Sequence, residues 1–260
     1  MEVIIQSPSD AARIAADSIV ALIDAKPDAV LGLATGSSPL GVYEELAKRY
    51  RAGEVSFARV SAFLLDEYVG LAADHPQRYR NVIKRELQDK LDLDPARVHS
   101  PDGLADDIPA ACLQYEQKIV DAGGVDIQLL GVGSDGHIAF NEPGSSLASR
   151  TRIKTLTAQT RQDNARFFDG AVEQVPSHCI TQGLATIMAA RHIMMLAQGG
   201  GKAEAVHQMV EGPVSAMWPA TVLQHHPRVS ALIDDEAAAK LQLADYYRLA
   251  YESKPAWQGL

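Results

Sequence analysis

Cysteine, basic charge and long apolar runs are all scarce in this sequence. Only two cysteines occur in 260 residues, Cys112 and Cys179, and they form no CxxC pair. This argues against a disulfide framework and favours two buried thiols in a reducing compartment. Basic residues number 24 against 33 acidic ones, which gives a net charge of −9. Such a balance disfavours a nucleic-acid partner or an anionic membrane surface, although it still allows a small phosphorylated ligand.

The sequence also lacks a recognisable targeting or membrane-spanning segment. The start, MEVIIQSPSD, has an acidic residue at position 2 and an apolar run too short for a signal peptide. The apolar stretch at 183–197 is interrupted by Arg191 and His192, so it does not read as a membrane span. No repeat, low-complexity segment or linker is evident. We therefore expect a cytoplasmic protein with a single domain over residues 1–260, a length that can bury one large core.

Short apolar runs alternate with longer segments of helical periodicity, a pattern typical of βαβ units. The apolar runs are continuous rather than alternating, which indicates strands buried on both faces. We therefore predict an α/β fold: an open, mostly parallel twisted sheet with helices on both faces. The expected strands are 3–6, 29–34, 60–66, 125–133, 192–197 and 229–234, and the expected helices are 7–25, 39–50, 76–91 and 107–122. Ligands of such sheets bind outside the carboxyl ends of the strands, so the loops at those ends are the first candidates for a site.

Two strands run into loops suited to an anion. After 29–34 come Thr35, Gly36, Ser37 and Ser38, where glycine, hydroxyl groups and a helix start together favour phosphate. The loop lacks the full GxGxxG and Walker patterns, so it does not indicate a dinucleotide or ATP. A capped helix start without a ligand explains it equally well.

The second such loop follows strand 192–197. Three glycines at 199–201 precede Lys202 at the start of the next helix, where a cation is unfavourable unless an anion is bound. Taken alone, the pattern fits better with a solvated lysine after a flexible turn. The presence of two such loops in one chain makes a phosphorylated ligand the stronger hypothesis.

Polar side chains at two further strand ends are candidates for acid–base chemistry. Asp66 directly follows a buried strand, where a carboxylate near apolar walls can serve as a base; a capping aspartate is an equal alternative. After 125–133 the chain continues SDGHIAFNEPGSS, which brings Asp135, His137 and Glu142 within eight residues. Two carboxylates can fix the tautomer and raise the basicity of the imidazole between them. A metal site is the main rival, but one histidine without a second histidine or a cysteine is a weak signal.

Four stretches give the chain a resemblance to a known family. LGLATGSSP, LLDEYVGL, GVGSDGHIAFNEPGSSLASRTRIKTLT and EGPVSAMW lie between about residue 3 and about residue 236. Together they resemble the glucosamine-6-phosphate deaminases of the glucosamine/galactosamine-6-phosphate isomerase family. The resemblance implies a Rossmann-like fold and, within amino-sugar (N-acetylglucosamine) catabolism, conversion of glucosamine 6-phosphate and water to fructose 6-phosphate and ammonia. It implies neither a metal nor an organic cofactor.

The same resemblance implies a role for each candidate residue. Asp66 matches the base that moves a proton between C2 and C1, and His137 matches the residue that opens the sugar ring, with Asp135 and Glu142 as its partners. The residues that match the phosphate-binding set of the family are Thr35, Gly36, Ser37, Ser38, Arg166 and Lys202. Rival hypotheses are a hydrolase resembling 6-phosphogluconolactonase and a sugar-phosphate-binding regulator without catalysis.

Regulation and assembly are also implied by the resemblance alone. Family members of this length are usually homohexamers that N-acetylglucosamine 6-phosphate activates. The matching effector segment holds Ser145, Arg152, Lys154 and Thr155, and Arg152 and Lys154 would share one face of an extended strand. Regulated members carry a tyrosine near the C-terminus, where this chain has Arg248 next to Tyr247.

Overall fold

The computed structural model describes residues 1–255 and 257–260. In this part of the chain, seven parallel strands form one sheet in the order β1-β10-β9-β6-β2-β3-β5. Their bounds are β1 Glu2–Ile5, β2 Val30–Leu33, β3 Ser61–Leu64, β5 Val98–His99, β6 Ile127–Gly131, β9 His192–Ala197 and β10 Val229–Ile233. The predicted open, mostly parallel α/β sheet is confirmed.

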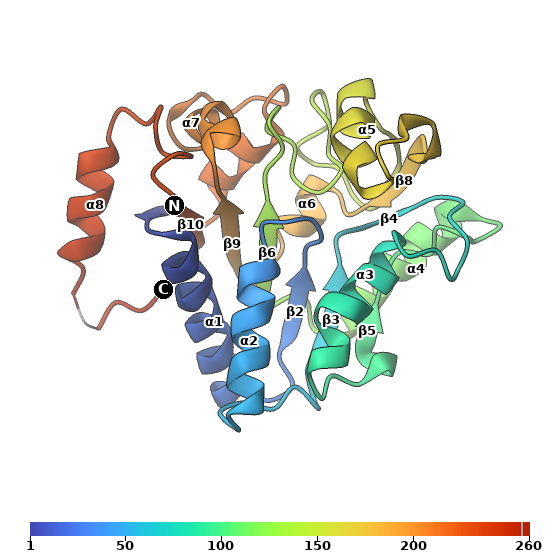
Figure 1. Cartoon of the computed structure of the whole chain (residues 1–260), viewed down its shortest axis with the longest axis horizontal. Helices are drawn as coiled ribbons and strands as arrows, with labels where there is room; N and C mark the ends of the chain where they lie inside the picture. The colour runs from blue at the N-terminus through green and yellow to red at the C-terminus, as the bar shows by residue number, and fades with distance from the viewer. Residues whose placement is uncertain (256) are drawn as a thin grey trace.

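Helices cover both faces of this sheet. In Figure 1, α1 and α2 lie across the nearer face, while the paler α4 and α6 lie behind. The α-helices are α1 Pro8–Ala25, α2 Leu40–Arg51, α3 Tyr79–Glu86, α4 Ile108–Asp121, α5 Ala158–Asn164, α6 Leu184–Ile187, α7 Ala203–Glu211 and α8 Ala244–Glu252. Short 3₁₀ helices are η1 Gln88–Lys90, η2 Pro95–Arg97, η3 Ala165–Phe167, η4 Val172–Gln174, η5 Gly200–Lys202 and η6 Pro219–His225.

The first helix begins where the sequence predicts. Ser7 is the N-cap of α1, its hydroxyl accepts the Asp10 N–H at 3.2 Å, and proline occupies the first turn. The small apolar side chains of α1 then pack on the sheet within one continuous core that includes β2, β3, β6, β9 and β10. No helix of the described residues is long and apolar enough to cross a membrane.

A second sheet was not predicted. It is antiparallel, in the order β4-β8-β7, with β4 Asp66–Tyr68, β7 Arg152–Thr155 and β8 His178–Thr181. The expected single strand at 60–66 is therefore wrong at its end, because the chain changes sheets at Leu65. The Leu65 N–H donates to Leu33 in the large sheet, while its carbonyl accepts the Gln182 N–H just beyond β8.

The expected helix at 76–91 is also too long at both ends. Helix α3 begins at Tyr79, and the backbone at Leu87 (φ −133°, ψ −60°) leaves the helical region before η1. Leu87 itself is buried, so core packing rather than periodicity determines where α3 ends.

Candidate active site

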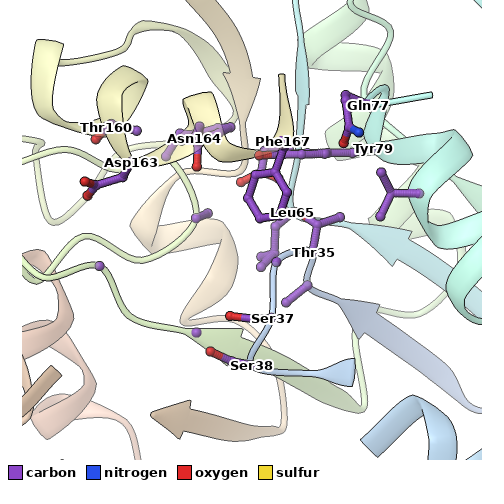
Figure 2. Close-up of a pocket in the computed structure, with 18 of the residues that line it drawn as sticks. Thr35, Ser37, Ser38, Leu65, Gln77, Tyr79, Thr160, Asp163, Asn164 and Phe167 are labelled. Atoms are coloured by element: carbon purple, nitrogen blue, oxygen red, sulfur yellow. The ribbon is translucent and has the colours of Figure 1, made fainter. Parts of the chain in front are cut away.

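A cavity of about 530 Å³ opens outside the carboxyl ends of the central strands. In Figure 2, Ser37 and Ser38 lie on one side of it, opposite Thr160 and Asn164 of α5. The cavity brings together eight of the residues singled out in the sequence: Thr35, Gly36, Ser37, Ser38, Asp66, His137, Arg166 and Lys202. Parallel strands bring these residues together because their carboxyl ends meet at one edge of the sheet.

The loop between β2 and α2 forms the floor of the cavity. Gly36 has a φ of +89°, a conformation that residues with a Cβ rarely adopt, so glycine is required for the turn. Pro39 then caps α2 without a side-chain hydrogen bond, which leaves the positive end of the helix beside Ser37 and Ser38. A hydroxyl-rich turn at a helix start is suited to hold an anion.

Two cations face the same cavity from other elements. Lys202 ends η5 and precedes α7, and Arg166 lies in η3, where its guanidinium sits 4.7 Å from the centre of the Phe167 ring. Burial lowers the pKa of Lys202, and the charge of Arg166 lowers it further, although Asp163 and Asp135 oppose this. Among the described residues, neither cation has a carboxylate within 4.0 Å. A bound anion would relieve the repulsion between them.

Asp66 is the first residue of β4, and its carboxyl group reaches the cavity although the residue is only 6% exposed. Burial, and then the charge of Glu67, raise the pKa of Asp66 well above the ordinary value. No described residue donates a hydrogen bond to this carboxylate. A desolvated carboxylate open to a ligand cavity is suited to accept a proton from carbon.

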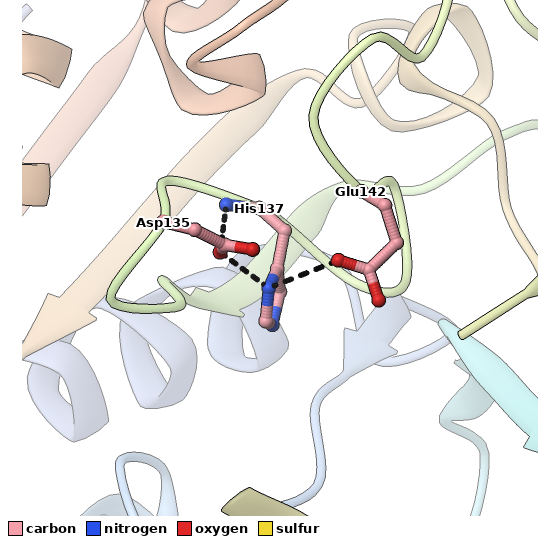
Figure 3. A group of neighbouring side chains, drawn as sticks. All are labelled: Asp135, His137 and Glu142. Atoms are coloured by element: carbon pink, nitrogen blue, oxygen red, sulfur yellow. Dashed lines mark hydrogen bonds and ion pairs between the residues drawn. The ribbon is translucent and has the colours of Figure 1, made fainter. Parts of the chain in front are cut away.

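The loop after β6 arranges Asp135 and Glu142 around the imidazole of His137 (Figure 3). Asp135 Oδ1 lies 2.7 Å from His137 Nδ1, and Glu142 Oε2 lies 3.8 Å from the same nitrogen. Burial raises the pKa of Asp135, but the hydrogen bond and charge of His137 outweigh it, so that pKa is lowered. The structure thus brings the three together, with Asp135 in direct contact and Glu142 beyond hydrogen-bonding distance.

Neighbouring segments hold this loop in place. Glu142 is buried, and its Oε1 accepts the N–H of Thr157, the N-cap of α5, at 3.1 Å. A Cβ on Gly133 would lie 2.3 Å from His137 Nδ1, so only glycine leaves room for the ring. The imidazole is therefore fixed between the backbone and Asp135, with an edge toward the cavity.

The same three residues are the ones that could hold a metal ion in the described part of the chain. One atom each from Asp135, His137 and Glu142 lies within 4.8 Å of the others. A single imidazole with two carboxylates is a sparse donor set for a transition metal.

The four residues of the expected effector segment lie away from the cavity. Arg152, Lys154 and Thr155 belong to β7, and the alternating burial of this strand puts the half-buried Arg152 and Lys154 on one face. Arg152 Nη1 donates to Asn141 Oδ1 at 3.0 Å. Ser145 is buried, and its hydroxyl has no hydrogen-bond partner among the described residues.

The residues near the C-terminus lie far from β7. Helix α8 packs on β1, at the edge of the large sheet away from β4, as Figure 1 shows. Tyr247 donates to Glu211 Oε1 at 3.2 Å, and Arg248 pairs with Asp235. Within one chain, neither residue reaches the effector segment.

Sequence reasoning missed the upper wall of the cavity. Gln77 lines it from the turn before α3, Tyr79 from α3 and Asn164 from α5. Tyr68 joins them: its hydroxyl accepts from Asn164 Nδ2 at 3.0 Å and from the Tyr79 hydroxyl at 3.3 Å. These residues follow no strand end of the parallel sheet. The tyrosine in DEYVGL was the available signal, because it lies two residues after Asp66 and so points to the same face of the strand.

Comparison with known proteins agrees with this geometry. The family model described as glucosamine-6-phosphate isomerases/6-phosphogluconolactonase matches residues 6–231. The chain belongs to that family. The glucosamine-6-phosphate deaminases of Beutenbergia cavernae and Mycolicibacterium smegmatis are each 67% identical to it, over 258 and 261 residues. These alignments cover 99% of both chains in the first case and 100% in the second.

Solved structures show the same fold. A monomeric glucosamine-6-phosphate deaminase superposes with a TM-score of 0.89 at 43% identity, covering 92% of this chain and 99% of that one. The 6-phosphogluconolactonase from Trypanosoma cruzi superposes with a TM-score of 0.74 at 22% identity, covering 93% and 97%. The second likeness bears on the fold alone.

Proposed function

We propose that this cavity is where the chain, as an isomerising deaminase, converts glucosamine 6-phosphate and water to fructose 6-phosphate and ammonia. The observation that carries the proposal is the composition of the cavity. An acid–base pair, Asp66 and His137, shares it with the hydroxyl-rich loop at 35–38 and with Arg166 and Lys202. The pair is suited to proton transfers on a sugar, and the loop and cations to a phosphate.

Ring opening requires that a proton leave the C1 hydroxyl and reach the ring oxygen. Imidazole is suited to both transfers, because it titrates near neutral pH. In the proposed step His137 carries the proton, and Asp135, 2.7 Å from Nδ1, orients the ring and stabilises its charged form. Glu142, with one oxygen unpaired, supplies a second negative charge nearby.

Isomerisation follows on the open chain. Asp66 removes the proton from C2 and returns it to C1, while the C2 ammonium group loses a proton and the C1 oxygen gains one, which leaves a C1 hydroxyl and a C2 iminium. Water hydrolyses this iminium to the ketone and ammonia. A buried carboxylate with a raised pKa is a stronger base than an exposed one, and this suits removal of a proton from carbon.

The phosphate is held away from the reacting carbons. The backbone and hydroxyls of Thr35, Gly36, Ser37 and Ser38 would bind it together with Arg166 and Lys202. These contacts are made equally in the ground and transition states, so they mainly supply orientation and affinity.

The test is product analysis with the purified chain. Glucosamine 6-phosphate should yield fructose 6-phosphate and ammonia in equal amounts, and unphosphorylated glucosamine should react far more slowly. Hydrolysis of 6-phosphogluconolactone without ammonia release from glucosamine 6-phosphate would instead assign the chain to the lactonase branch. Binding of the sugar phosphate without turnover of either would indicate a regulator.

Assembly and regulation complete the proposal. The effector segment and the C-terminal tyrosines lie at opposite sides of one chain, so a site using both needs a second copy. We therefore propose a cytoplasmic homohexamer in which N-acetylglucosamine 6-phosphate binds near Ser145, Arg152, Lys154 and Thr155. The structural relative at 43% identity is monomeric, which makes measurement of the assembly state decisive.

A further inference from the structure

Glu67 is a fully buried carboxylate that the proposed reaction does not use. It is 0% exposed and lies in β4 next to Asp66. Its Oε1 accepts the N–H groups of Tyr68 at 3.0 Å and Tyr79 at 2.9 Å, and its Oε2 accepts the N–H of Arg80 at 3.0 Å. Burial raises the pKa of Glu67, and the three backbone donors, together with the charge of Arg78, oppose that rise by stabilising the charged form.

These contacts do the work of a helix cap. Arg78 occupies the N-cap position of α3 but gives no side-chain hydrogen bond, so the first N–H groups of α3 are satisfied by Glu67 from another element. Arg78 Nε also lies 3.6 Å from Glu67 Oε2. Helix α3 in turn presents Tyr79, Val82 and Arg85 to the cavity. One side chain therefore joins the wall of the cavity to the strand that carries the proposed base.

We propose that Glu67 is a positioning residue for proton transfer, which fixes α3 against β4 and places a negative charge beside Asp66. This inference rests on the proposed role of Asp66 as the base. Successive residues of a strand point to opposite faces, so Glu67 does not enter the cavity and does not contact the substrate. It acts through Asp66 and Tyr79.

Few charged groups other than Glu67 lie close enough to Asp66 to shift its pKa. The other titratable groups facing Asp66 are neutral acids, contributed by β4, α3, α4 and β8: Tyr68, Tyr79, Tyr115 and Cys179. The charged or titratable groups that share the cavity with it are His137, Arg85, Arg166, Lys202, Glu86 and Asp163. Glu67 itself faces Arg78, which also lies 3.8 Å from the exposed Asp102. Of all these groups, only the charge of Glu67 shifts the pKa of Asp66.

The consequence is a pH effect with a definite sign. Burial raises the pKa of Asp66, and the charge of Glu67 raises it further. Removing that charge should lower the pKa of Asp66, so the base should become ionised, and active, at lower pH. A purely structural cap would change the rate and KM without moving the pH at which activity appears.

The experiment measures kcat/KM for glucosamine 6-phosphate against pH in the full-length chain. The acid limb of this profile is the pH range over which activity rises as the base becomes ionised. For Glu67→Gln, we expect the acid limb to move to lower pH by roughly 0.5–1 pH unit, the size expected of one neighbouring charge in partly buried surroundings. Glu67→Asp keeps the charge but shortens the cap, so its acid limb should stay at the wild-type pH while KM changes. The ionisations of the substrate are common to all variants and cancel in the comparison.

Asp126→Asn is the matched control. Asp126 is also buried, accepts a backbone N–H, from Val30 at 2.8 Å, and pairs with two cations, Lys26 and Arg191. It lies at the amino ends of β2 and β6, whereas the cavity lies at the carboxyl ends of the strands. Its loss should therefore lower thermal stability and leave the acid limb at the wild-type pH.

Arg78→Gln gives a test of opposite sign, which remains available if Glu67→Gln does not fold. With its cation gone, Glu67 acts more strongly on Asp66, and the acid limb should move up. Three results would overturn the inference. They are an acid limb that does not move in folded Glu67→Gln, a shift in Glu67→Asp as large as that in Glu67→Gln, and an acid limb that does not move in Arg78→Gln. Asp66→Asn distinguishes failure of the proposed base from failure of the role of Glu67. Normal turnover in Asp66→Asn would show that the proposed base is wrong. An inactive Asp66→Asn, together with unmoved acid limbs in Glu67→Gln and Arg78→Gln, would reject the role of Glu67 alone.

Discussion

The Asp66 carboxylate has an environment that favours catalysis at the expense of stability. Its pKa is raised by burial and by Glu67, so the folded chain binds this proton more tightly than the unfolded chain does. The resulting stabilisation is fully present below the unfolded pKa, about 3.9, and is lost as the pH rises through the raised folded value. Above that value, the charged carboxylate is a cost to the fold.

Asp66→Asn should therefore inactivate the enzyme and, at the same time, stabilise its folded state. Loss of a positioned base should lower kcat by ~10²–10⁴. At pH 8 the melting temperature should rise by about 2–4 °C, the shift that roughly 1 kcal/mol produces in a chain of this size. The gain should disappear as the pH falls through about 4, because wild-type Asp66 becomes protonated in both states below its unfolded pKa of about 3.9. Steady-state kinetics and thermal melts across this range measure both effects.

The control for this prediction is Asp126→Asn, which should lower the melting temperature because it breaks the pairs with Lys26 and Arg191. A normal kcat in Asp66→Asn would contradict the assigned base. A melting temperature that falls equally at pH 8 and at about pH 4 would contradict the cost ascribed to its charge.

Lys202 is expected to act on affinity. Lys202→Ala removes one of the three cations that line the cavity, the others being Arg85 and Arg166, so KM should rise by about tenfold or more while kcat falls less. Initial rates over a wide range of glucosamine 6-phosphate concentration give both constants. Lys48→Ala, which removes an exposed lysine of α2, should leave them unchanged. If kcat at saturating substrate fell as much as kcat/KM in Lys202→Ala, the lysine would instead act in the chemical step.

Single residues at strand ends were predictable from the sequence, and residues elsewhere in the cavity were not. Asp66, His137 and Lys202 each follow an apolar run, and the geometry of a parallel sheet brings such positions together. Tyr79 and Asn164 reach the cavity from α3 and α5. Nothing in their local sequence indicates this, because their position depends on the contacts of Glu67 and Tyr68.

At the scale of elements, periodicity located the central strands and the long helices but not the second sheet. Strands β4, β7 and β8 are three or four residues long, too short to show an alternation pattern on their own. The boundary at Leu65 was hidden because the apolar run at 62–65 continues across it without a break. Only the hydrogen bonds of Leu65, one toward each sheet, show where β3 ends.

The loop after β6 is close to its packing limit, which gives an element-scale prediction. Gly133→Ala places a methyl group 2.3 Å from the His137 ring, so the ring must turn away from Asp135. We expect kcat to fall by roughly tenfold to a hundredfold and stability to fall by about 1–3 kcal/mol from overpacking. Kinetics and chemical denaturation test this.

Gly259→Ala is the control for the added methyl group, since nothing lies within 4 Å of that position. It should change neither quantity. Unchanged kinetics in Gly133→Ala would show that the imidazole does not need its observed orientation.

At the scale of the whole molecule, the small sheet links the proposed effector residues to the active site. Asp66 pairs with Thr181 on β8, and Thr181 pairs with Arg152 on β7, so the three side chains share one face in one row. Arg152 also bonds Asn141, the residue before Glu142. Ligand binding at Arg152 is thus two strands from the proposed base.

Arg152→Ala combined with Lys154→Ala should therefore remove activation by N-acetylglucosamine 6-phosphate. In the wild type, the effector should lower the substrate concentration for half-maximal rate, and in the double variant it should not, while the rate at saturating substrate stays largely intact. Saturation curves with and without effector, together with sedimentation to determine the assembly state, measure this. Lys240→Ala, an exposed lysine paired with Glu204, serves as the control. Superimposable wild-type curves would show that no working activator site exists here.

The change of sheet at Leu65 has a consequence for substrate length. The loop at 35–38 and the glycines before Lys202 extend from strands of the large sheet, whereas Asp66 belongs to the small one. The distance from the proposed phosphate loop to the proposed base therefore depends on how the two sheets are placed against each other. A change at Leu65 that shifts the small sheet against the large one would alter the length of sugar phosphate that spans the proposed site.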